Sequence, residues 1–311
     1  MRAPSSKRVY IQEVCTRDGF QAEARFVPTP QKVALIDRLS QTGLALIEVS
    51  SFSSPKAIPM LADAEEVFRQ IERRPGVEYS ALVPNVKGGE RALAANASML
   101  NMVISASESH NRANLKMSSD QSLSQFASMT AAARGKVKIS ASVATAFGCP
   151  FEGEVPVDRV LEIINRLVAL EIGHIALSDT TGMANPAQVR HLFDVVLPRW
   201  PAVTFTAHFH DTRAMGLANV VAALDSGVTH FDASLGGLGG CPFAPGATGN
   251  ICTEDLVHML ECMGYDTGVN LEALLTAARS LQKIVGHDVP GHLIKAGPSS
   301  RRYSLSDASG Q

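Results

Sequence analysis

Two histidines separated by one residue, His208 and His210, are the first residues whose spacing suggests chemistry. They end a short apolar run, and residues i and i+2 of a strand project to the same face, so both imidazoles point the same way. Two imidazoles and one carboxylate make a divalent metal site, and Asp18 is the natural carboxylate donor. The alternative is a pair of partly buried histidines bonded to the backbone, which is the more common role of an isolated His-x-His.

A glycine-rich segment, residues 236–250, is the second such feature, with six glycines in fifteen residues. Glycines permit positive φ angles and a close backbone approach to a ligand, and they also allow a mobile flap. Within this segment the thiol of Cys241 is a candidate proton donor or nucleophile, and the alternative is an incidental exposed cysteine. Asn250 closes the segment, either as the N-cap of a following helix or as a hard oxygen ligand for a metal.

The elements that must position these residues alternate regularly along the chain. Eight short apolar or β-branched runs are each followed by a stretch with apolar residues at helical spacing. The predicted strands are residues 9–14, 46–50, 79–83, 100–105, 137–143, 174–178, 203–208 and 230–234. This pattern predicts the α/β class and a closed (β/α)8 TIM barrel. Residues 269–296 are predicted to add one or two further C-terminal helices.

The chain is predicted to form one barrel domain, residues 1–296, followed by a polar, disordered tail over 297–311. Active sites of such barrels lie at the carboxyl ends of the strands. Polar residues gather there in this sequence: Arg17, Asp18 and Gln21 follow the first strand, Glu48 lies in the second, and Asp179 ends the sixth.

The composition excludes several classes of protein. The 28 Lys and Arg nearly balance the 30 Asp and Glu, which removes the electrostatic case for nucleic acid or an anionic membrane. No apolar run approaches ~18 residues, and the first eight residues are too short for a targeting peptide. Five cysteines without C-x-x-C spacing indicate a reducing, cytoplasmic location, with Cys252 and Cys262 predicted to be buried apolar residues.

Four motifs together resemble one family. They are Arg17-Asp18-Gly19, His208-x-His210, the glycine-rich segment with its cysteine, and Phe-Gly-Cys-Pro-Phe-Glu-Gly at 147–153. The chain resembles the 3-hydroxy-3-methylglutaryl-CoA lyase family over residues 8–285. This family belongs to the metal-dependent lyase barrels that include the isopropylmalate and homocitrate synthases.

The resemblance implies a role for each candidate residue, an acyl-CoA substrate and a homodimer. The implied ligands of Mg²⁺ or Mn²⁺ are Asp18, His208, His210 and Asn250. The implied catalytic residues are Arg17, Asp18, His208 and Cys241, of which Arg17 polarises the thioester carbonyl and Cys241 transfers a proton. The implied substrate-binding or substrate-orienting residues are Arg17, Gln21, Glu48 and Asp179.

The sequence departs from the family where a lysine is usual, because Ala24 stands there and Arg25 follows. Alternation along an extended segment would aim Arg25 at the opposite face, so we expect hydroxymethylglutaryl-CoA to be cleaved less efficiently than a related thioester. The alternatives are a lyase for a thioester such as citramalyl-CoA, or a condensing synthase, which would need further C-terminal domains. A non-haem iron oxygenase and a barrel that only binds a ligand are less consistent with the pattern.

Overall fold

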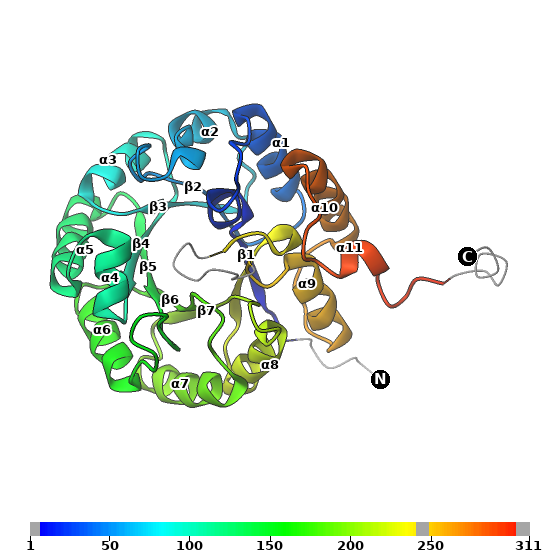
Figure 1. Cartoon of the computed structure of the whole chain (residues 1–311). Helices are drawn as coiled ribbons and strands as arrows, with labels where there is room; N and C mark the ends of the chain where they lie inside the picture. The colour runs from blue at the N-terminus through cyan, green and yellow to red at the C-terminus, as the bar shows by residue number, and fades with distance from the viewer. Residues whose placement is uncertain (1–6, 241–248, 303–311) are drawn as a thin grey trace.

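The computed structural model describes residues 7–240 and 249–302 of the chain. Eight parallel strands close into a barrel in chain order, with β1 pairing to both β2 and β8, so the predicted (β/α)8 TIM barrel is confirmed (Figure 1). The strands are β1 (Tyr10–Glu13), β2 (Leu46–Ser51), β3 (Glu78–Val83), β4 (Met99–Ser105), β5 (Lys138–Ala144), β6 (His174–Asp179), β7 (Thr204–Phe209) and β8 (His230–Ala233).

Helices form a ring outside the strands (Figure 1). They are α1 (Thr29–Leu39), α2 (Ala64–Gln70), α3 (Val86–Ala94), α4 (Glu108–Leu115), α5 (Ser119–Ala133), α6 (Val157–Ala169), α7 (Pro186–Arg199), α8 (Gly216–Ser226), α9 (Thr253–Cys262), α10 (Leu271–Val285) and α11 (Leu293–Ala296). Short helical turns η1 (Cys15–Gly19), η2 (Pro59–Leu61) and η3 (Leu235–Gly237) lie in the connections. Among the described helices, none is long and apolar enough to cross a bilayer.

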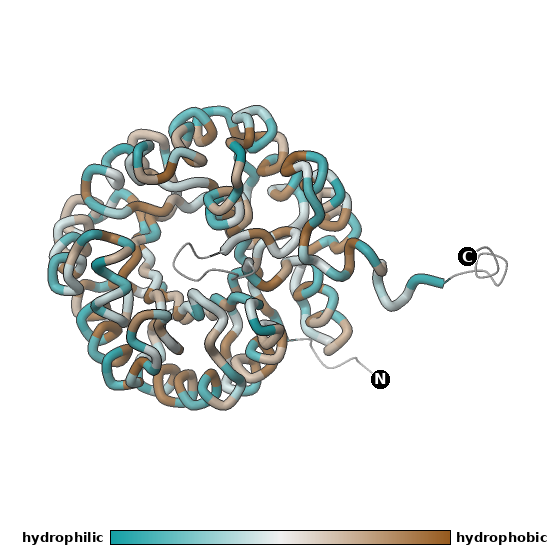
Figure 2. Tube along the Cα trace, in the orientation of Figure 1, coloured by the Kyte–Doolittle hydropathy of each residue, from teal (hydrophilic) through white to brown (hydrophobic). Residues whose placement is uncertain are grey.

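The helices of the ring bury an apolar stripe against the strands, whereas α10 and α11 pack on neighbouring helices. In α6 the residues Val160, Ile163, Ile164 and Leu167 are fully buried, at the spacing that puts them on one face of a helix. Hydrophilic residues lie on the outer side of the ring (Figure 2). The core is therefore the layer between strands and helices.

The two C-terminal helices predicted from the sequence are α10 and α11, which lie outside β1, beside α1 and α9 (Figure 1). The side chain of Asn270 caps α10, and Gly286 ends it with a φ of 76°. Cys252 is buried as predicted, but the prediction for Cys262 is wrong. Cys262 is exposed because it lies at the end of α9, off the buried face of that helix.

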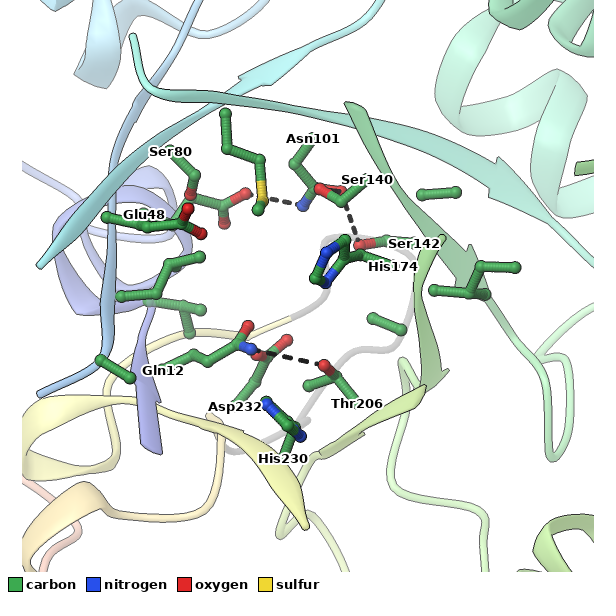
Figure 3. Close-up of a pocket in the computed structure, with 18 residues that line it drawn as sticks. Gln12, Glu48, Ser80, Asn101, Ser140, Ser142, His174, Thr206, His230 and Asp232 are labelled. Atoms are coloured by element: carbon green, nitrogen blue, oxygen red, sulfur yellow. Dashed lines mark hydrogen bonds between the residues drawn. The ribbon is translucent and has the colours of Figure 1, made fainter. Parts of the chain in front are cut away.

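The inside of the barrel is unusually polar. Such interiors are normally filled by branched apolar side chains. Here a cavity of about 120 Å³ runs within the ring of strands (Figure 3). Its polar lining includes Gln12, Glu48, Ser80, Asn101, Ser140, Ser142, His174, Thr206, His230 and Asp232.

Candidate active site

A single π-helical turn, η1, follows β1 and carries Arg17 and Asp18. The backbone N–H of Gly19 donates to the carbonyl of Val14 over 3.4 Å, which closes this wide turn. Turns of this kind are rare and occur often at functional sites. A side chain at position 19 would be crowded, because a Cβ there would lie 3.0 Å from the Cβ of Leu238.

The guanidinium of Arg17 lies between two carboxylates. Its Nε donates to Oε2 of Glu48, in the middle of β2, and its Nη1 donates to Oδ1 of Asp18. Burial alone would lower the pKa of Arg17, but the charges of Asp18 and Glu48 outweigh burial and raise it. Arg17 is therefore a permanently charged group held in a fixed orientation.

His208 lies near the end of β7 and His210 directly follows that strand, and both are buried. Their ring centroids lie 5.2 Å apart. The register between β7 and β8 places Asp232 opposite His208, and Nδ1 of His208 donates to Oδ2 of Asp232 over 3.0 Å. This bond fixes the His208 ring and leaves its Nε2 free of that carboxylate.

Asn250 joins the cluster from the far end of the chain. It forms an antiparallel bridge with His210, and its Nδ2 donates to Oδ2 of Asp18 over 2.7 Å and to the carbonyl of Leu238 over 3.1 Å. The N-cap alternative for Asn250 is excluded because Cys252 caps α9. Gly239, with a φ of 127°, packs against this amide, and a Cβ there would lie 2.5 Å from Nδ2.

The surroundings shift the pKa values of Asp18, His208 and His210 in different directions. Burial would raise the pKa of Asp18, but Arg17 and the two histidines lower it to about 2. For His210, burial and then the neighbouring His208 lower the pKa to about 4. Burial also opposes the charged form of His208, but Asp232 outweighs it and raises the pKa. An ionised carboxylate thus faces a neutral imidazole, the forms in which both bind metals.

The cluster fits a divalent cation. Asp18, His208 and His210 each offer one ligand atom, and these three atoms lie within 4.8 Å of one another. Within the described part of the chain, Nδ1 of His210 and Oδ1 of Asn250 are buried without a hydrogen-bond partner. Buried orphan lone pairs need explanation, and a bound ion supplies one. Two imidazoles, a carboxylate and an amide oxygen are all groups that bind divalent cations.

The remaining predicted residues are distributed around this centre. Asp179 ends β6 beside β7, accepts from the N–H of Met183 over 2.7 Å, and has a pKa raised by burial to about 6. Gln21 is partly buried one turn beyond η1. Cys241 lies outside the described residues. Arg25 is exposed at a bend, so the extended conformation assumed for residues 24 and 25 is wrong.

Sequence reasoning missed the acidic residues that hold these segments from behind. Asp232 orients His208, and Glu13 is fully buried below η1. One oxygen of Glu13 accepts from the N–H groups of Cys15 (2.8 Å) and Leu235 (2.9 Å), and the other accepts from the Thr253 hydroxyl (2.8 Å). The sequence did contain a signal for both residues, because each is an acidic residue within a predicted apolar strand.

Fold and cluster together define a class, a (β/α)8 barrel with a candidate metal centre at the carboxyl ends of its strands. The chain belongs to the HMGL-like family, whose model matches residues 8–281. The resemblance seen in the sequence is therefore confirmed.

Individual relatives agree over nearly the whole chain. The hydroxymethylglutaryl-CoA lyase YngG of Bacillus subtilis is 44% identical over 298 residues, covering 96% of this chain and 100% of that protein. The mitochondrial hydroxymethylglutaryl-CoA lyase of Rattus norvegicus is 44% identical, covering 87% and 84%. A solved HMG-CoA lyase from Acinetobacter baumannii, in complex with coenzyme A and 3-methylmalate, superimposes with a TM-score of 0.94 at 47% identity, covering 97% and 99%.

Proposed function

We propose that the chain is a divalent-metal-dependent carbon–carbon lyase that cleaves hydroxymethylglutaryl-CoA to acetyl-CoA and acetoacetate. The observation that carries this proposal is one continuous cluster: Arg17 is fixed beside Asp18, and Asp18 adjoins His208, His210 and Asn250. It places a fixed cation next to a candidate metal centre. Relatives named for this activity, at 44% identity, support the substrate.

Cleavage between C2 and C3 of a 3-hydroxyacyl thioester first needs the C3 hydroxyl to lose its proton. Asp18, His208, His210 and Asn250 would hold the metal, which when bound supplies a Lewis acid that lowers the pKa of a hydroxyl. Asp18 or His208 takes the proton. The Asp232 carboxylate favours His208, because it stabilises the imidazolium that results. His208 can accept the proton only at Nε2, so in that case the metal would be held by Asp18, His210 and Asn250.

The electron pair of the C2–C3 bond then moves onto the thioester as C3 becomes a ketone. Arg17 stabilises the enolate oxygen, since its charge is permanent and its orientation is set by Glu48 and Asp18 before substrate binds. Cys241 protonates C2 of the enolate from its thiol. The products are the ketone of acetoacetate and the thioester of acetyl-CoA, so protons and electrons balance.

Related reactions are the alternatives to be tested. A citramalyl-CoA lyase or a condensing synthase would use the same metal ligands and the same Arg17. A non-haem iron oxygenase is disfavoured, because the closed α/β barrel differs from the β-sandwich usual for that class. We further propose a cytoplasmic homodimer acting in leucine degradation or ketone-body formation, as the family resemblance implies, with residues 1–296 as one domain and 297–311 as a tail.

The deciding experiment incubates the purified protein with hydroxymethylglutaryl-CoA, citramalyl-CoA and Mg²⁺ or Mn²⁺. We expect acetoacetate and acetyl-CoA in equal amounts from the first substrate, and release about 10²–10³-fold slower from the Arg17→Gln variant. If only citramalyl-CoA were cleaved, that thioester would replace hydroxymethylglutaryl-CoA as the proposed substrate. Net condensation of acetyl-CoA with a keto acid would replace the lyase by a synthase.

A further inference from the structure

An amide inside the barrel, Asn101 on β4, contacts the site without being part of the proposed chemistry. It lines the cavity together with Glu48 (Figure 3). Its Nδ2 donates to Oε1 of Glu48 over 2.7 Å. This is a hydrogen bond to a buried carboxylate, a kind stronger than a neutral one.

Two serines of β5 hold the oxygen of this amide. The hydroxyls of Ser142 and Ser140 lie 3.0 and 3.4 Å from Oδ1 of Asn101, and both donate to it. If the amide turned over, its oxygen would face the Glu48 carboxylate, and its nitrogen would face the serine hydroxyls. The Glu48 carboxylate therefore keeps Nδ2 of Asn101 pointed at it, and the two serine hydroxyls, which can donate or accept, donate to the oxygen on the other side.

The contacts on Glu48 extend this arrangement to Arg17. One carboxylate oxygen of Glu48 is held by Asn101, and the other accepts from Nε of Arg17. A carboxylate held at only one oxygen would be free to turn about its last side-chain bond. The amide removes that freedom, so the position of Arg17 depends on a residue in the interior of the barrel.

We propose that Asn101 is a positioning residue: through Glu48 it sets the orientation of the Arg17 guanidinium toward the thioester oxygen of the substrate. The inference deepens the proposed function and rests on it for the role of Arg17. The row of hydrogen bonds from Ser142 through Asn101 and Glu48 to Arg17 carries the argument.

Gln12 offers a matched control within the same cavity. It is also an amide that lines the barrel interior, but its Nε2 donates to the hydroxyl of Thr206 over 3.4 Å, away from Asn101 (Figure 3). An apolar substitution at either position places a similar side chain in the same cavity. Only the substitution at Asn101 removes a contact on Glu48.

The test compares Asn101→Leu with Gln12→Leu in cleavage of hydroxymethylglutaryl-CoA. Since a hydrogen bond to a charged group is worth roughly 1.5–3 kcal/mol, we expect Asn101→Leu to lower kcat by about tenfold to a hundredfold. KM and Mn²⁺ affinity should stay within about twofold, and Gln12→Leu should keep its kcat. An unchanged kcat, or a change confined to KM, would overturn the proposal.

Ser142→Ala keeps the proposal testable if Asn101→Leu does not fold. It removes the shorter of the two hydrogen bonds to Oδ1 and so loosens the amide against Glu48, and kcat should fall several-fold. Adding Ser142→Ala to Asn101→Leu should cause no further loss, because both changes act through one contact. Losses that multiply in the double variant would indicate two separate structural effects and would contradict the proposal.

A spectroscopic readout separates this inference from the activity itself. In protein labelled with ¹⁵N-arginine, the Nε–H signal of Arg17 is assigned by its disappearance in Arg17→Gln. Asn101→Leu or Ser142→Ala should shift or broaden this signal, and Gln12→Leu should not. An unmoved signal overturns the positioning role. A moved signal in a protein that cleaves no thioester would instead overturn the proposed function.

Discussion

Glu13 makes the stability of the barrel depend on pH, because its carboxyl group is fully buried. Burial is the largest influence and raises its pKa from 4.5 to about 8, against three hydrogen bonds that favour the ionised form. We expect Glu13→Gln to remove this dependence. Glutamine keeps the contacts: its carbonyl accepts from Cys15 and Leu235, and its amide donates to the hydroxyl of Thr253.

The sign follows from proton binding. Between pH 4.5 and 8 the unfolded chain has released the Glu13 proton and the folded chain still holds it, so the free energy of unfolding falls as pH rises. Each pKa unit corresponds to about 1.4 kcal/mol. Over the 2.5 units from about pH 5.5 to 8, Glu13→Gln should therefore gain roughly 3 kcal/mol of stability relative to the unmodified protein.

The assay is urea unfolding of the metal-free protein at pH 5.5, 6.5 and 8.0, followed by the fluorescence of the single tryptophan, Trp200. The exposed Glu90→Gln serves as the control, and its difference from the unmodified protein should stay constant with pH. If the difference for Glu13→Gln were also constant from pH 5.5 to 8.0, the buried carboxyl would not titrate as argued.

Five further outcomes test the site. Removal of metal by a chelator should abolish activity, Mn²⁺ or Mg²⁺ should restore it, and His210→Ala should weaken Mn²⁺ binding in calorimetry; a fully active metal-free protein would refute the metal site. Arg17→Gln should lower kcat by about 10²–10³ with little change in KM, and a raised KM alone would reassign this residue to binding. Cys241→Ser should behave likewise, since a hydroxyl is a much weaker acid than a thiol; near-normal turnover would make the cysteine incidental. Gly239→Ala should weaken Mn²⁺ binding at least tenfold, because its Cβ has no space beside the amide ligand, and unchanged affinity would show that this backbone can move. From the family comparison, Ala24→Lys should raise kcat/KM for hydroxymethylglutaryl-CoA relative to a thioester without the second carboxylate, and equal effects on both would exclude a role in specificity.

The barrel and its metal cluster were predictable because both follow from local patterns. Strands show as short apolar runs, and each end found in the structure differs from the predicted one by at most one residue. Active sites of such barrels lie at the carboxyl ends of the strands, and this rule alone predicted that Asp18 lies near His208 and His210. No knowledge of strand register was needed.

The supporting contacts were not predictable, since they depend on how strands align across the barrel. Asp232 meets His208 only through the register of β7 with β8, and Asn101 reaches Glu48 across the barrel interior. The π-helical turn has no spacing signature of its own. Cys262 was misplaced because the apolar pattern of α9 does not fix how its last turn faces the core.

Asp18 and Asn250 are 232 positions apart in the chain, yet their side chains share a hydrogen bond. During synthesis the ribosome must therefore release nearly the whole barrel before the cation can find its complete ligand set. The first half of the chain contains one of the four proposed ligands and neither histidine of the pair. We therefore expect the metal to be bound late in folding. The time at which refolding protein takes up Mn²⁺ would then report when β1 pairs with β8.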